Sequence, residues 1–161
     1  MILNKESAGK KLRRMALEVA ERNYDNDSLI LIGIKENGIF IAQNIAGHLN
    51  ELFKGSVQVI DLWLDKKDPG EIKLSENINF NDKTILLIDD VANSGRTMLY
   101  ALKPLLLHKP REIQTLALVE RTHKKFPIAV NYVGVSISTT QQENIVVDVK
   151  DGEVLGARLG S

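Results

Sequence analysis

The chain of 161 residues contains no cysteine, three histidines and few aromatic residues, which make up 5% of it. Without cysteine there can be neither a disulfide framework nor a thiolate metal site, and three scattered histidines argue against a zinc centre. The 21 basic residues are matched by 21 acidic ones. The chain therefore lacks the basic excess that is typical of a dedicated nucleic-acid-binding protein.

Long apolar segments are also missing. The N-terminus becomes polar within a few residues, so it has no signal-peptide core, and no apolar run approaches membrane-spanning length. We therefore expect a cytoplasmic protein with no membrane partner. The length fits a single domain over residues 1–161, and a hydrophobic content of 43% suffices for one buried core.

Helical and strand patterns alternate along the chain. Apolar residues at spacings of three and four predict a helix over 5–22, and further helices are expected over 39–52 and 98–107, where Pro104 predicts a kink or an early end. Short apolar runs predict strands over 28–34, 57–64, 85–88, 113–119, 132–135 and 145–149. This alternation favours an open, mainly parallel twisted sheet with flanking helices, which binds ligands beyond the carboxyl ends of its strands.

The strongest chemical signal is an acidic pair, Asp89 and Asp90, directly after the apolar run 85–88. Carboxylates at the end of a buried strand are costly to bury alone, so they should meet water, a cation or hydroxyl groups. Hard oxygen ligands suit Mg2+, and we predict that the pair binds this metal or the hydroxyls of a sugar. Helix capping and the aspartate pair of a phosphorylation receiver domain are the alternatives.

A small polar loop follows the acidic pair. Backbone N–H groups of such a loop, at the start of a helix, can cradle a phosphate, and Ser94 and Thr97 can donate further hydrogen bonds. Gly95 permits a turn that other residues resist. We therefore predict a phosphate site formed by Ala92, Asn93, Ser94, Gly95, Arg96 and Thr97.

Two further segments are candidates for contact with a second, larger anion. Lys35, Glu36, Asn37 and Gly38 follow the first predicted strand, where backbone N–H groups can face a pyrophosphate; an ordinary strand-to-helix turn is the alternative. The polar stretch 65–81 is long for a compact domain, and such loops are often lids. Its lysines Lys66, Lys67 or Lys73 could close over the anion, or they could serve only solubility.

The string 85–97 resembles the phosphoribosyl-pyrophosphate motif of type I phosphoribosyltransferases: four apolar residues, two acidic ones, then a Ser-Gly-x-Thr loop. Segments 32–42 and 117–128, and the continuation from 132–134 through 138–140, are similar to one branch of that family. This branch is the bifunctional pyrimidine operon attenuation protein with uracil phosphoribosyltransferase activity. The resemblance covers most of residues 10–147.

The resemblance implies an activity and a set of roles. The enzyme would move 5-phosphoribose from phosphoribosyl pyrophosphate to a nucleobase, with uracil the expected acceptor in pyrimidine salvage, and would use Mg2+ and form a homodimer. Asp89 and Asp90 would contact the ribose hydroxyls, and 92–97 would hold the 5-phosphate. Departures from the pattern are Asn37 where the branch has arginine, Ser138 where proline is usual, and Asn93 where many members have aspartate.

Three alternatives stay open. The first is an RNA-binding regulator of pyrimidine genes, for which basic residues would form one face: Lys10, Lys11, Arg13, Arg14, Arg121, His123, Lys124 and Lys125. Neutral net charge disfavours it. The second is a purine phosphoribosyltransferase, which Asn93 disfavours, because the aspartate of some family members assists proton transfer at a purine. The third is a regulator that binds the donor without turnover.

Overall fold

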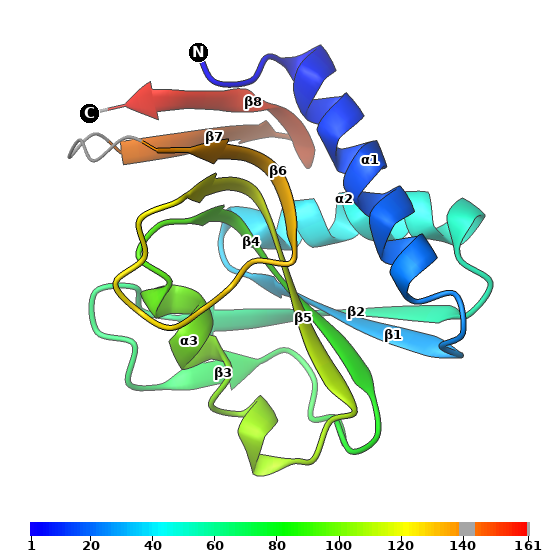
Figure 1. Ribbon diagram of the computed structural model, residues 1–161. Helices are drawn as coiled ribbons and strands as arrows, with labels where there is room; N and C mark the ends of the chain where they lie inside the picture. Colours follow the sequence, from blue (N-terminus) through cyan, green and yellow to red (C-terminus); the bar gives the residue numbers. More distant parts are fainter. Residues whose placement is uncertain (139–143, 161) are drawn as a thin grey trace.

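The computed structural model describes residues 1–138 and 144–160. Its centre is a six-stranded twisted sheet in the order β3-β2-β1-β4-β5-β6 (Figure 1). All neighbouring strands in this sheet are parallel except β3, which runs antiparallel to β2 at one edge. The predicted fold class, a mainly parallel sheet with flanking helices, is confirmed.

The elements in chain order are α1 (Lys5–Arg22), β1 (Ser28–Ile34), α2 (Asn37–Leu52), β2 (Ser56–Leu64), β3 (Ile72–Leu74), β4 (Thr84–Ala92), α3 (Arg96–Ala101), the 3-10 turn η1 (Leu105–Leu107), β5 (Glu112–Arg121), β6 (Tyr132–Ile137), β7 (Asn144–Lys150) and β8 (Glu153–Gly160). The last two strands form a separate antiparallel hairpin.

Local sequence explains where the first helix begins. The Asn4 side chain accepts a hydrogen bond from the Ser7 backbone N–H at 2.8 Å, and the Ser7 hydroxyl accepts one from the Asn4 N–H at 2.9 Å. This reciprocal capping box satisfies two backbone donors that the first helical turn leaves without a partner. The predicted bounds of α1 are confirmed.

Each central strand is covered on both faces. In β1, Leu29 and Leu31 pack into the core beneath α1 and α2, whereas Ile30 and Ile32 belong to the core on the opposite side, with α3 and η1. Residues that alternate along a strand point to opposite faces. Burial on both faces therefore explains why the strands are unbroken apolar runs in the sequence.

The sequence-based elements are wrong in three places. The short strand β3 lies inside the stretch predicted as a loop over 65–81, and strand β8 was not expected. The third helix ends at Ala101 instead of reaching residue 107, because Pro104 supplies no N–H for a continuing helix. In β8, Ala157 exchanges backbone hydrogen bonds with Leu3, which brings the two termini together (Figure 1).

The strand order creates an opening at one point. From β1 the chain returns to the sheet through β2 on one side, whereas β4 lies on the other side of β1 and is followed outward by β5 and β6. Such a reversal leaves a crevice beyond the carboxyl ends of the central strands. Here those ends are Ile34 of β1 and Ala92 of β4, which carry the two predicted loops.

Candidate active site

The acidic pair lies in β4, next to the crevice, and its two carboxylates have different surroundings. The Asp89 side chain is only 1% exposed. Its Oδ1 accepts a hydrogen bond from the Asp90 N–H at 2.8 Å, and its Oδ2 lies 3.5 Å from the Lys66 Nζ. Asp90 is half-buried and lines a large cavity. The buried carboxylate thus meets a lysine ammonium, and the outer one faces open space.

Burial has the largest influence on the pKa of Asp89. Desolvation of the carboxylate raises the pKa of Asp89 well above its usual value, the charge of Lys66 lowers it, and the neighbouring Asp90 raises it again. The ion pair with Lys66 therefore opposes the cost of keeping a buried negative charge. Lys66 is itself 45% exposed, so water screens part of its effect.

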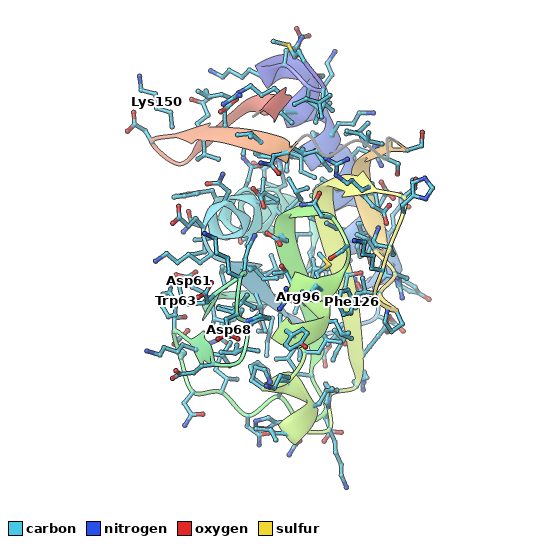
Figure 2. All side chains as sticks on the ribbon, turned by 90° about the vertical axis from the view of Figure 1, so that its left-hand side faces the viewer. Asp61, Trp63, Asp68, Arg96, Phe126 and Lys150 are labelled. Atoms are coloured by element: carbon cyan, nitrogen blue, oxygen red, sulfur yellow. The ribbon has the colours of Figure 1, made fainter. Side chains whose placement is uncertain are left out.

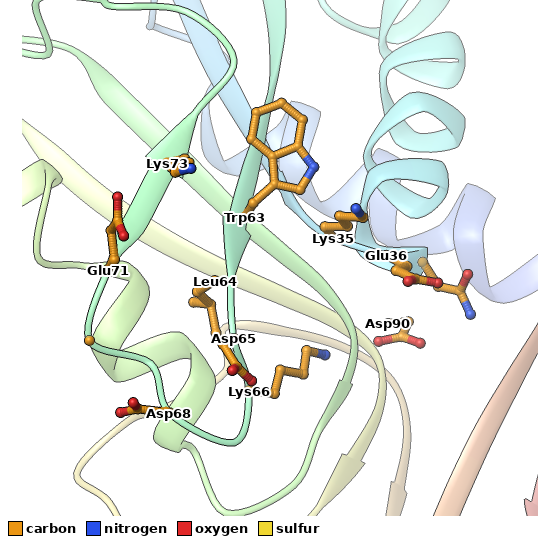
Figure 3. Close-up of a pocket in the computed structure, with 12 residues that line it drawn as sticks. Lys35, Glu36, Trp63, Leu64, Asp65, Lys66, Asp68, Glu71, Lys73 and Asp90 are labelled. Carbon is orange, nitrogen blue, oxygen red and sulfur yellow. The ribbon is translucent and has the colours of Figure 1, made fainter.

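The large cavity has a volume of about 880 Å³ and lies on the β2 side of the acidic pair. Figure 3 shows the Lys66 side chain extending across it toward the side where Glu36 and Asp90 lie. Three lysines, five carboxylates and one tryptophan contribute to its wall. The lining residues are Lys35, Glu36, Asn37, Trp63, Leu64, Asp65, Lys66, Asp68, Gly70, Glu71, Lys73 and Asp90.

The predicted pyrophosphate loop forms one wall of this cavity. Its cis peptide joins Lys35 to Glu36, and the Lys35 N–H donates to the Leu62 carbonyl at 2.8 Å. Asn37 and Gly38 were predicted to belong to the loop, but they form the first turn of α2. The Asn37 side chain donates to the Val147 carbonyl at 2.8 Å, which ties this turn to the β7–β8 hairpin.

Gly38 allows α2 to approach the acidic pair. A Cβ atom at this position would lie 2.8 Å from the Ile88 carbonyl oxygen and 3.1 Å from the Asp89 Cα. Real side chains do not tolerate such a contact with backbone. A glycine is therefore required for the first turn of α2 to contact β4.

The predicted phosphate loop forms a second, smaller cavity of about 70 Å³. Ala92 closes β4 and Arg96 opens α3, so only Asn93, Ser94 and Gly95 lie between the two elements. The backbone of Gly95 has φ +89°, which favours glycine. The lining residues are Lys66, Asp89, Val91, Ala92, Asn93, Ser94, Gly95, Arg96, Thr97 and Met98.

A distant segment holds the phosphate loop in place. The Ser94 carbonyl accepts hydrogen bonds from the N–H groups of Lys125 at 3.0 Å and Phe126 at 3.1 Å. In the view of Figure 2, Arg96 and Phe126 lie near the centre, with Trp63 and Asp68 to their left. The acidic pair contributes to both cavities, because Asp90 lines the large one and Asp89 lines the small one at the phosphate loop.

The structure separates the two lid candidates. Lys66 lines both cavities, whereas the exposed Lys67 lines neither of them. Lys73 lies opposite Trp63 on the β2–β3 pair and also faces the large cavity. Trp63 is half-buried and forms part of the wall of the large cavity.

Several basic residues of the proposed RNA-binding face form ion pairs or hydrogen bonds within the chain. Arg14 pairs with Glu18 and donates to the carbonyls of Val133 and Gly134. Lys10 pairs with Glu6, and Lys124 pairs with Glu120. Of the third resembling segment, Thr139 and Thr140 lie outside the described residues.

The acidic pair suits Mg2+ by its donor chemistry. Mg2+ usually takes one or two carboxylates and completes its shell with water and substrate phosphates. Asp90 offers such an oxygen to the large cavity, with Asp89 behind it. The described residues contain no cluster of three or more histidine, aspartate or glutamate side chains that would hold a metal without a substrate. No helix in the described part of the chain is long and apolar enough to cross a membrane.

Known proteins share both the sequence and the fold. The phosphoribosyl transferase domain family matches residues 1–151. The bifunctional protein PyrR of Ligilactobacillus salivarius is 35% identical, over 88% of this chain and 89% of that protein, and PyrR of Bacillus cereus is 33% identical, over 94% and 91%.

Solved structures extend the likeness. The hypoxanthine phosphoribosyltransferase of Trypanosoma cruzi has a TM-score of 0.81 at 13% identity, with 99% and 95% of the two chains covered. A hypoxanthine-guanine phosphoribosyltransferase of Bacillus anthracis has a TM-score of 0.74 at 21% identity, with 91% and 84% covered. At such identities these structures establish the shared fold alone. The family match and the PyrR relatives, together with the geometry above, show that this chain belongs to the type I phosphoribosyltransferase family.

Proposed function

We propose that this phosphoribosyltransferase transfers 5-phosphoribose from phosphoribosyl pyrophosphate to uracil and releases pyrophosphate. The observation that carries the proposal is the pair of cavities that meet at the acidic pair, with Asp90 in the wall of the large one and Asp89 in the wall of the small one. The small one has the size and the loop backbone to hold a single phosphate, and the large one has room and lysines for a pyrophosphate. A ribose that joins the two groups would lie over the acidic pair.

Each part of the donor then has residues to hold it. The loop 92–97, with Ser94 and Thr97, binds the 5-phosphate. Asp89 and Asp90 fix the ribose hydroxyls, and Asp90 holds Mg2+ from the large cavity. Mg2+ held there would supply positive charge that offsets the negative charge of the pyrophosphate leaving group. The first turn of α2 directs its N–H groups and the positive end of its dipole toward the same anion.

Catalysis rests on positioning and electrostatics. Breaking the bond between the sugar and the pyrophosphate leaves positive charge on the ribose ring, which Asp89 and Asp90 stabilise. Lys66 moves from Asp89 to the pyrophosphate, and the segment 65–81 covers the large cavity and excludes water. No covalent intermediate with the protein is required.

Pyrophosphate release tests the proposal. Purified protein with phosphoribosyl pyrophosphate, Mg2+ and uracil should release pyrophosphate, and Asp90→Asn should reduce kcat/KM by about 100-fold or more, as for loss of a group that stabilises transition-state charge. The Asp25→Asn variant, in the exposed turn after α1, is the matched control, because it makes the same chemical change at a residue that lines neither cavity. Donor binding without release for any base would replace the proposal with a donor-binding regulator.

RNA binding is the second candidate, because the relatives are called bifunctional. The engagement of Arg14, Lys10 and Lys124 within the described structure speaks against a broad basic face. We therefore expect weak RNA affinity with a shallow dependence on salt. A steep fall in affinity as salt is raised would instead indicate many phosphate contacts. The homodimer implied by the resemblance is tested by the molar mass in solution.

A further inference from the structure

The connection between β5 and β6 lies against two consecutive residues of the phosphate loop. Successive backbone N–H groups of the connection, those of Lys125 and Phe126, donate to the Ser94 carbonyl at 3.0 and 3.1 Å. At the next position, a Cβ atom added to Gly95 would collide with the Ile128 side chain. The middle of the phosphate loop is therefore in direct contact with the connection, and it must follow any shift of the connection.

The path of this connection is held by a lysine side chain. Residues 122–131 form neither helix nor strand, so no regular ladder of backbone hydrogen bonds fixes their course. Lys124 folds back onto the end of β5, where its Nζ donates to the Glu120 carboxylate at 2.7 Å and to the Arg121 carbonyl. Lys124 immediately precedes Lys125, whose N–H contacts the phosphate loop. The ion pair thus fixes the residue next to that contact.

Both members of the ion pair are largely buried. The side chains of Lys124 and Glu120 are 15% and 17% exposed, so water screens their attraction far less than that of an exposed pair. The Glu120 carboxylate also accepts a hydrogen bond of 3.4 Å from the Ser136 hydroxyl on β6. Removal of the lysine ammonium would leave a largely buried carboxylate without the cation that pairs with it, which is strongly unfavourable. The end of β5 and the connection would then move to bring the carboxylate into water.

We propose that Lys124 is a positioning residue for the substrate phosphate: its ion pair with Glu120 holds the β5–β6 connection, and the connection holds the phosphate loop. Neither side chain lines the small cavity, so the effect passes through the backbone and not through contact with the ligand. The inference rests on the proposed function in one respect, that the loop 92–97 binds the 5-phosphate of the donor. A lysine that binds RNA needs an accessible ammonium, whereas the Lys124 side chain is largely buried.

Calorimetric titrations with ribose 5-phosphate and with inorganic pyrophosphate, each with Mg2+, test the phosphate loop and the large cavity separately. Lys124→Met should weaken the binding of ribose 5-phosphate about 10-fold or more, because a small displacement of the loop lengthens several hydrogen bonds to the phosphate at once. The affinity for pyrophosphate should stay within about twofold, because no residue of the connection lines the large cavity.

Three further variants separate the ion pair from a general change of charge. Lys124→Arg should restore most of the affinity for ribose 5-phosphate, because a guanidinium group keeps the charge and the donors. Glu120→Gln should weaken binding in the same direction, and the double variant with Lys124→Met should lose no more affinity than the weaker single variant, since the two residues act as one pair. Lys54→Met, at an exposed residue just before β2, is the matched control and should change neither affinity.

The transfer reaction supplies a second readout. Lys124→Met should raise the KM for phosphoribosyl pyrophosphate by a factor similar to the loss of ribose 5-phosphate affinity, and kcat at saturating donor should stay within about threefold. Where Lys124→Met does not fold, Glu120→Gln provides the same comparison. An equal loss of affinity for both ligands, or no loss for either, would overturn the inference. Binding of ribose 5-phosphate that depends on Lys124, without turnover of any base, would contradict the proposed function and support the positioning role.

Discussion

Substitution of Lys66 by methionine should destabilise the fold in a manner that depends on pH. Lys66 is the cation beside the buried Asp89 carboxylate, at 3.5 Å. A hydrogen-bonded charge pair contributes about 1.5–3 kcal/mol, and the 45% exposure of Lys66 reduces this to about 1–2 kcal/mol near pH 7.5. For a chain of this length that corresponds to a lower Tm by roughly 2–8 °C.

The direction of the pH dependence follows from Asp89. Burial raises the pKa of Asp89 in the folded protein above its pKa in the unfolded chain. The contribution of Asp89 to stability is therefore complete at pH values below the unfolded-state pKa, and it is lost as pH rises through the folded-state pKa. Removing Lys66 takes away the charge that lowers this pKa, so the loss becomes larger at high pH. The difference between wild type and Lys66→Met should therefore shrink as pH falls and Asp89 is protonated.

Urea unfolding followed by Trp63 fluorescence at pH 7.5 and at pH 5 measures this difference. Lys67→Met is the matched control, because Lys67 is exposed and lines neither cavity. A double variant with Asp89→Asn should cancel most of the effect of Lys66→Met, since the two residues would no longer interact. Equal stability of the two lysine variants at both pH values, or a difference that grows on acidification, would refute the reasoning.

Three further predictions concern the helix contact, the metal and the structural core. Gly38→Ala should lower the free energy of unfolding by about 1–3 kcal/mol and weaken donor binding, because the added Cβ meets the Ile88 carbonyl. Gly47→Ala has open space around it and should raise the free energy of unfolding by about 0.5–1 kcal/mol. Urea unfolding of the two variants measures both values. Chelation with EDTA should abolish pyrophosphate release and added Mg2+ should restore it, while unaltered release in EDTA would exclude a metal role for the acidic pair. Tyr132→Phe removes a buried hydrogen bond of 2.6 Å to Gln114 and should cost about 1 kcal/mol without changing kcat, as unfolding and steady-state assays would show.

The parts of the site that the sequence predicts are continuous in the chain. Asp89 and Asp90 follow four apolar residues, and the loop 92–97 comes next, so one short string contains both. The parallel sheet then brings the loop after β1 to the same edge, as strand alternation implies. The physical rule for parallel sheets thus predicts the location of the site before any contact is known.

The contacts that complete the site join distant segments, and no local pattern encodes them. Lys66 reaches Asp89 from 23 residues away, Arg121 reaches Asn93 from 28 residues away, and Asn37 reaches Val147 across 110 residues. Each of these contacts depends on the three-dimensional path of a loop or hairpin. The charge pattern and the hydrophobic periodicity of the sequence do not specify that path.

The final strand was missed for a related reason. The segment Glu153–Gly160 contains two glycines and an arginine, so its apolar alternation is weak. Its position is set by pairing with β7 and with Leu3 at the other end of the chain. Tertiary pairing, rather than local propensity, therefore determines this strand.

Direct identification of the product tests the central claim. The protein is incubated with phosphoribosyl pyrophosphate, Mg2+ and labelled uracil, and the products are separated and weighed by mass spectrometry. The account predicts uridine monophosphate in amounts equal to the pyrophosphate released, with Asp90→Asn nearly inactive. Unchanged uracil alongside intact donor, or nucleotide formation only when labelled hypoxanthine replaces uracil, would contradict it.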